Sequence, residues 1–406
     1  MQRLRSSDRT NSLTVLASLL AVIVLLLVLQ DAFEVMLLPR RVERQYRFTR
    51  IYFRFVWANW SRFAVRFPPG PRRENMLSYF GPLSMLALFA LWAAALITCF
   101  GTLEWALQPE TPGHPASVFA EQLYMSGVTF FTLGYGDIVP HSAAARLVSV
   151  LEAGTGIGFI AVVIGYLPVL YQVFARREAH VIQLDARAGS PPTAVALLCR
   201  HAEPEALPVL DHLLRDWEFW SAELIESHLS YPMLAFYRSQ HDNQSWLAAL
   251  CAIMDCCALI LVGVQGVPPL QARMTFAIAR QVVVEMSRSL HIGPSRWDGN
   301  DRLPPEAFDQ MLASFAEAGV EWAPDEDGAA VLAALRATYE PLLDGLSLRL
   351  LTPLPGWIPT DAATDHWERG HRGMLARRLV KELADPREEN PAVRRGLWRR
   401  LRIGAR

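Results

Sequence analysis

FFTLGYGDIVP, residues 130–140, places two glycines around a tyrosine between two strongly apolar segments. In a soluble protein such a run would be a turn, because glycine adopts left-handed backbone conformations without steric cost. At membrane depth, backbone without helix or sheet hydrogen bonds is tolerated only where protein buries it or where it lines a water-filled cavity. The interpretation of this stretch therefore depends on whether the flanking segments cross a membrane.

Three apolar segments are long enough to cross a bilayer, which requires about 20 residues of helix. The first contains residues 13–29, a run without charged side chains, and the others are 79–103 and 147–174. Arginines precede the first run, as they do in a signal peptide, but the QDAFEV that follows it lacks a small-residue cleavage pattern. We therefore expect residues 1–38 to be a retained transmembrane helix.

The segment between the second and third apolar runs contains a shorter apolar stretch, VFAEQLYMSGVTFF. Its length does not suffice to span a bilayer and suits a re-entrant helix that enters and leaves on one side. We therefore predict, within residues 76–177, an outer helix over 79–103, a short helix over 117–131 and an inner helix over 143–175.

The segment 39–75 is dominated by arginine. It has ten arginines between residues 39 and 73, against Glu43 as the one acidic residue there. Positively charged loops stay on the cytoplasmic side, so we expect this loop and the C-terminal part of the chain inside the cell and the glycine-tyrosine stretch outside. Lys381 is the one lysine among 39 basic residues, a bias typical of GC-rich bacterial genomes. We expect a multi-pass protein of the inner (plasma) membrane.

A helix, a re-entrant helix, TLGYGD and a second helix, in this order, resemble the pore module of potassium channels over residues 76–177. In that family, backbone carbonyls of the filter replace the hydration shell of the ion. The resemblance assigns the selectivity filter to Thr132, Leu133, Gly134, Tyr135 and Gly136. It implies that the first four bind K⁺ and that the last opens the outer mouth.

Four residues around the filter carry its support in this interpretation: Asp137, Tyr124, Val128 and Phe131. By the resemblance, Asp137 braces the filter from behind, but Val128 stands where some relatives have a glutamate that pairs with this aspartate. We expect Tyr124 to be the partner instead. Phe131 replaces a hydroxyl residue that is frequent before the filter, and Leu133 replaces a valine.

Each chain has one filter motif, so the resemblance implies a homotetramer with cyclic symmetry. We expect gating to involve three residues of the inner helix: Gly156, Pro168 and Glu152. Gly156 suits a hinge or close helix packing, and Pro168 removes a backbone donor. An acid inside a span indicates function by default. Glu152 is therefore either a cation-attracting or gating carboxylate, or a neutral, hydrogen-bonded brace behind the filter.

Within the segment 39–75, RFTRIYFRFVWANWSRFAVRF mixes arginine with aromatic residues, the composition of helices at the lipid headgroup boundary. The interface candidates are Arg44, Arg47, Arg54, Trp57 and Trp60. Such a helix would bind anionic lipid or couple the cytoplasmic domain to the pore, and the sequence leaves both open. A voltage sensor is disfavoured, because only one span precedes the arginines.

The remainder of the chain predicts a linker over 178–192, an α-helical cytoplasmic domain over 193–390 that tunes gating, and a basic tail over 391–406. Apolar residues recur at helical spacing through this domain. Residues 247–264 imitate a fourth span, but Asp255 at their centre favours a helix buried in protein. We find no nucleotide-binding glycine motif, metal-ligand spacing or catalytic constellation. We therefore expect no enzymatic activity, no cofactor and no nucleic-acid partner.

The sequence thus predicts an all-α membrane protein that conducts K⁺ passively, with K⁺, membrane lipids and sister chains as its partners. A weakly selective cation channel is one alternative. A non-conducting membrane scaffold or sensor with a vestigial pore is another, although the intact TLGYGD argues against it.

Overall fold

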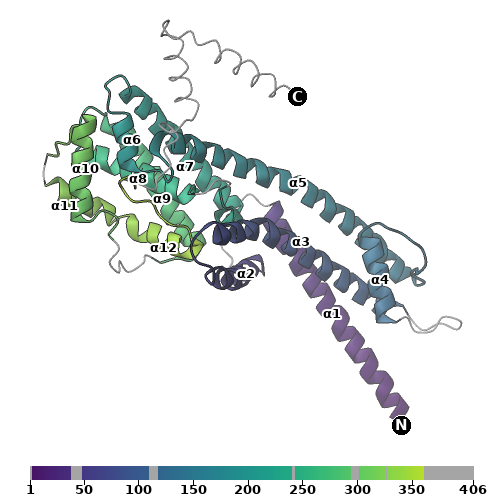
Figure 1. Cartoon of the computed structure of the whole chain (residues 1–406). Coiled ribbons are helices and arrows are strands. Elements are labelled where there is room, and N and C mark those ends of the chain that lie inside the picture. Colours follow the sequence, from purple (N-terminus) through teal and green to yellow (C-terminus); the bar gives the residue numbers. More distant parts are fainter. Residues whose placement is uncertain are drawn as a thin grey trace, which may run out of the picture.

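The structure is a computed structural model, and its elements are helices (Figure 1). It describes residues 2–37, 48–108, 118–239, 243–293, 301–325 and 327–360. Within these ranges no strand forms beyond an isolated bridge between Val264 and Trp322. The all-α prediction is confirmed.

In the part of the chain that the structure describes, three helices are long and apolar enough to cross a membrane: α1 (Gln2–Met36), α3 (Pro71–Leu107) and α5 (Ala143–Ala188). The short helix α4 (Phe119–Phe130) packs between α3 and α5, while α1 lies along α3 (Figure 1). Ser142 caps α5 by accepting a hydrogen bond from the N–H of Ala145. The Ser142 hydroxyl also donates to the carbonyl of Leu107, which holds the ends of α3 and α5 together.

Helix α5 is longer than predicted and crosses the expected linker. Val181, Leu184 and Ala188 form an apolar face that is buried in the core of the C-terminal domain, so the helix continues to Ala188. It ends at Gly189, whose φ of 86° suits a residue without a Cβ. The predicted linker over 178–192 is therefore wrong for residues 178–188, which are helical.

Helix α2 (Phe48–Ala64) turns two of the predicted interface residues, Trp57 and Trp60, toward the protein. The Trp57 side chain is 2% exposed, and its indole N–H donates to the carbonyl of Arg349 at 3.0 Å. Trp60 is partly buried and donates to the carbonyl of Met76. Trp57 is thus not a lipid-facing residue, because the inner face of α2 packs on the C-terminal domain.

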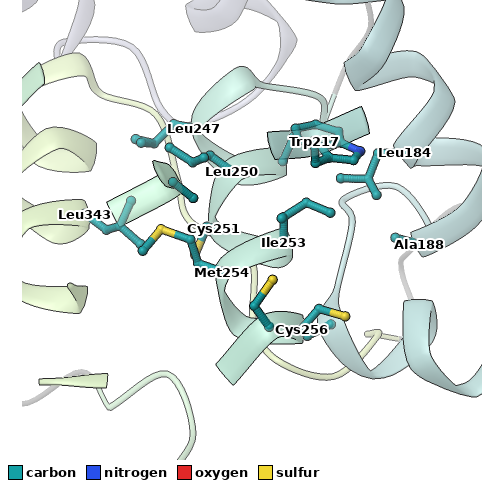
Figure 2. Packing of buried hydrophobic residues seen from close by; sticks show 14 of the residues in the cluster. Leu184, Ala188, Trp217, Leu247, Leu250, Cys251, Ile253, Met254, Cys256 and Leu343 are labelled. Atoms are coloured by element: carbon teal, nitrogen blue, oxygen red, sulfur yellow. The ribbon is translucent and has the colours of Figure 1, made fainter. Parts of the chain in front are cut away.

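The described part of the C-terminal domain is a helical bundle around α8 (Trp246–Val262). Its other helices are α6 (Ala194–Arg200), α7 (Leu207–Ser230), η1 (Pro232–Phe236), α9 (Pro269–Ser289), α10 (Pro305–Ala318), α11 (Gly328–Arg336) and α12 (Glu340–Leu350). Figure 2 shows Leu250 and Ile253 of α8 beside Trp217 of α7 and Leu184 of α5. The predicted basic tail lies outside the described residues.

Asp255 explains why α8 is buried in protein and does not cross the membrane. Its carboxylate is fully buried, accepts from the Tyr339 hydroxyl at 2.7 Å and forms an ion pair with Arg302. Arg302 also pairs with Glu340, at 3.0 Å. The surrounding helices therefore compensate the charge that would make α8 a poor membrane span.

Candidate functional site

The segment after α4 alternates between two backbone conformations. Thr132, Gly134 and Gly136 have φ values of 59°, 60° and 75°, and Leu133 and Tyr135 between them have negative φ. Alternating left- and right-handed residues turn successive carbonyls toward the same side of the chain. The glycines adopt this conformation at little cost, whereas Thr132 is strained, and such strain typically marks functional sites.

The end of α4 holds the start of this segment. The N–H of Phe131 donates to the carbonyl of Gly127, that of Thr132 to Thr129 and that of Leu133 to Val128, at 3.1, 3.0 and 2.8 Å. The segment therefore continues directly from the C-terminus of the helix. A helix C-terminus carries partial negative charge, which stabilises a cation bound near its last turn.

The structure pairs the two support residues that we expected to meet. The Tyr124 hydroxyl lies close enough to the Asp137 carboxylate to interact with it, so the tyrosine side chain reaches from α4 toward residue 137. Val128 is buried on the inner side of α4, and Phe131 is half exposed. Val128 is therefore packed against protein, and its part in supporting a filter stays a prediction.

Gly156 lies where α5 passes closest to the end of α4. A Cβ at this position would lie 2.1 Å from the carbonyl oxygen of Phe130, too close for any side chain. Gly154, Gly158 and Gly165 of the same helix have no neighbouring heavy atom within 4 Å of such a Cβ. The geometry thus supports close packing at Gly156. The hinge stays a prediction, and α5 continues as one helix through Gly156 and Pro168.

Behind α4, two acidic side chains are buried together. The Ser126 hydroxyl lies within hydrogen-bond distance of both the Glu152 carboxyl group and the carbonyl of Ile97, the latter at 2.7 Å, and its single proton serves one of the two at a time. Glu104 of α3 is fully buried and close enough to interact electrostatically with Glu152. This contact favours the brace interpretation of Glu152, because its carboxyl group points at the back of α4.

The sequence reasoning did not select Glu104 or Ser126. A signal for Glu104 was present, because it is an ionisable residue at the end of an apolar run. Ser126 carries no such signal, since a serine in a short apolar helix has many roles. Only the packing of α3, α4 and α5 brings the three side chains together.

Arg177 anchors the opposite end of α5 to the C-terminal domain. The arginine is buried and donates to the carbonyls of Leu234 and Tyr237, both at 2.8 Å, and it pairs with Glu178 at 2.9 Å. The residues around η1 thereby contact α5 on one side. On the other side they contact α3, where a Cβ at Gly81 would collide with the Tyr237 ring.

The interface candidates of the arginine-rich segment are divided by the structure. Arg44 and Arg47 lie outside the described residues. Arg54 is exposed on α2, whereas Trp57 and Trp60 face the protein. Of the two interpretations of this helix, coupling of the C-terminal domain to the membrane helices is supported by direct contacts.

Comparisons with known proteins agree with this geometry. Residues 85–172 match the family model described as an ion channel. Over 102 residues, 25% of this chain and 26% of the relative, the sequence is 33% identical to Two-pore potassium channel 1 of Arabidopsis thaliana. Two-pore potassium channel 4 of the same plant is 29% identical over 104 residues, which are 26% of this chain and 30% of that one.

A further relative is the uncharacterized membrane protein YdjJ of Bacillus subtilis (strain 168). It is 24% identical over 194 residues, 47% of this chain and 56% of its own. The chain thus matches between about a quarter and just over half of the length of these relatives. No solved structure matches significantly. The resemblance to a potassium-channel pore module is confirmed, for this segment of the chain.

Proposed function

We propose that the chain forms a potassium-selective channel in which four copies surround one pore and conduct K⁺ passively. The observation that carries the proposal is the alternating backbone between Thr132 and Gly136. The family match over residues 85–172 spans the same stretch. We further propose that the channel lies in the plasma membrane with its C-terminal domain in the cytoplasm.

The proposed mechanism replaces water around the ion by protein carbonyls. A K⁺ ion that enters the pore loses its hydration shell and needs several oxygen ligands at once. The carbonyls of Thr132, Leu133, Gly134 and Tyr135 form one column of such ligands. One column covers one side of an ion, so four chains are required to surround it.

Exposed apolar side chains support this assembly. In the single chain, Leu133 is 54% and Tyr135 66% exposed beside the filter, and Val150 of α5 is 70% exposed. Contiguous exposed apolar surface marks a contact with protein or lipid. Neighbouring chains would cover the filter side chains, while lipid would cover the outer faces of α1 and α3.

Gating would act through α5. This helix runs without interruption from the segment after the filter to the core of the C-terminal domain. Arg177 ties it there to the residues around η1. A rearrangement of the C-terminal domain would therefore move the lower part of α5 and change the width of the pore.

A flux measurement tests the proposal. The full-length protein, reconstituted in liposomes, should release K⁺ down its gradient. Gly134→Ala should abolish the flux, because alanine disfavours the φ of 60° at this position. Gly154→Ala is the control, since its Cβ would meet no neighbour within 4 Å. Absence of flux in the wild-type protein at every voltage and pH tested would favour the scaffold alternative.

A further inference from the structure

An open cavity of about 350 Å³ lies between α2 and the end of α12. Its lining includes Trp57 and Arg62 of α2, Val65 just after that helix, and Leu348 and Arg349 of α12. Small-molecule sites of proteins begin at about this volume. The lining combines two arginines with apolar side chains, so it suits a ligand with an anionic and an apolar part.

The positive charge at this cavity is not neutralised. Among the described residues, no carboxylate lies within ion-pair distance of Arg54, Arg62 or Arg349. Burial lowers the pKa of Arg349, and the neighbouring charge of Arg54 lowers it further. Three guanidinium groups without an acidic partner attract an anion, and arginine binds phosphate through two parallel hydrogen bonds.

The surroundings of the cavity resemble a membrane surface more than an aqueous one. Phe55 is 69%, Phe63 48% and Leu348 66% exposed, and they lie on the same helices as the arginines. Helix α2 begins beside the end of the span α1, where the Thr49 hydroxyl donates to Asp31 at 2.5 Å. Exposed phenylalanine and arginine on one helix next to a span are typical of the headgroup boundary.

We propose that this cavity binds the head group of an anionic phospholipid, with Arg62 and Arg349 on the phosphate and Val65 and Leu348 against the first part of the acyl chains. The site is not the arginine loop as a whole, because its lining comes equally from the C-terminal domain. A bound lipid would therefore hold the C-terminal domain against the membrane.

A short chain of contacts leads from this site to α5. The Arg349 carbonyl accepts from Trp57, and the next two carbonyls, of Leu350 and Leu351, accept from Arg238 at 2.6 and 3.0 Å. Arg238 follows Tyr237, whose carbonyl accepts from Arg177 of α5. Resting on the proposed channel function, we infer that lipid at this site changes the open probability through α12, Arg238 and Arg177.

Binding is tested on the full-length protein in detergent by native mass spectrometry, with short-chain phosphatidylglycerol as the probe. Each of Arg62→Gln and Arg349→Gln should weaken binding by about fivefold, the effect of one arginine near an anionic surface. Arg273→Gln on α9 removes an exposed arginine that does not line the cavity and should leave binding unchanged. Arg62 is exposed, so its replacement leaves the core intact.

Three results would overturn the lipid site. Equal binding by the wild-type protein and both variants would show that the lipid attaches elsewhere. Equal weakening by Arg273→Gln would indicate unspecific attraction. Competition by inorganic phosphate at the same concentration as the lipid would indicate a site for free anions. This measurement does not depend on ion flux. It therefore tests the lipid site even if the protein conducts no ions.

Discussion

The C-terminal domain and the pore module differ in whether their buried acidic side chains have basic partners. In the domain, Asp255 pairs with Arg302, and Arg336 pairs with both Glu340 and Asp301. In the pore module, Glu104 and Glu152 are buried, and among the described residues their polar neighbours are serines. The domain balances its charges, whereas the module buries two acids without a cation.

This difference suggests that the ion pairs of the domain serve its stability, whereas the buried acids of the pore module serve conduction. A buried ion pair leaves little net charge and keeps the domain in one arrangement, but it offers nothing to a permeant ion. Buried acids without a basic partner are costly, and the cost favours their neutral form. In the channel that we propose, the module also offers the carbonyls of residues 132–135 to an ion. We therefore expect substitutions in the domain to affect folding and substitutions in the module to affect conduction.

The largest effect is expected from Asp255→Ala. This change removes one of the two carboxylates that pair with Arg302 and leaves the Tyr339 hydroxyl unpaired, and breaking a buried pair costs about 3–5 kcal/mol. Chemical denaturation of the protein, followed by circular dichroism, should show the domain unfolding at lower denaturant. Asp309→Ala, at an exposed position of α10, is the matched control. If the Asp255→Ala variant were as stable as the Asp309→Ala control, the buried ion pair would not stabilise the C-terminal domain.

Gly156→Ala should be the next most severe change. Its Cβ would lie 2.1 Å from the Phe130 carbonyl oxygen, so α5 has to move away from α4, at a cost of about 1–3 kcal/mol. Conduction should be lost while the C-terminal domain keeps its denaturation midpoint. Normal K⁺ flux in this variant would mean that the contact between α4 and α5 does not position the filter.

Glu152→Gln should have a small effect. The glutamine amide can still donate to or accept from the Ser126 hydroxyl, so a neutral brace is preserved, and flux should stay within about twofold of wild type. Glu152→Leu, which cannot accept this bond, should reduce flux. A large change in conductance or block with the glutamine variant would instead assign the carboxylate a role in attracting cations.

The smallest effect concerns the cysteines of the domain core. Cys251, Cys256 and Cys257 are fully buried, and burial raises the pKa of each thiol well above its usual range. Since the thiolate is the reactive form, alkylation at pH 8 should leave all three unmodified until the domain unfolds. Mass spectrometry after brief exposure to iodoacetamide checks this. Rapid labelling of Cys256 in the native protein would contradict the described core.

The parts that the sequence predicts well are those that rest on local chemistry. The two glycines of TLGYG indicate an irregular backbone, and both adopt positive φ values. Asp255 inside an apolar run indicates that α8 is buried in protein. Thr193 caps α6, as its position before an apolar run indicates. These features are decided within a few residues of the chain.

The parts that were missed depend on contacts between distant segments. The sequence predicts Trp57 to be a lipid anchor, but its indole N–H donates to the carbonyl of Arg349, 292 residues later in the chain. Arg177 is likewise buried against Leu234 and Tyr237, which follow it by 57 and 60 residues. No local pattern indicates such partners, because composition alone does not tell which face of a helix another domain covers.

The selectivity of the proposed pore is the central claim, and a bi-ionic recording tests it most directly. The full-length protein is incorporated into a planar bilayer between K⁺ and Na⁺ solutions, and the reversal potential is measured while the K⁺ ratio is varied. The reversal potential of a K⁺-selective pore should shift by about 59 mV for each tenfold change, the potential whose work on one charge equals about 1.4 kcal/mol. A current whose reversal potential ignores the K⁺/Na⁺ ratio would contradict it.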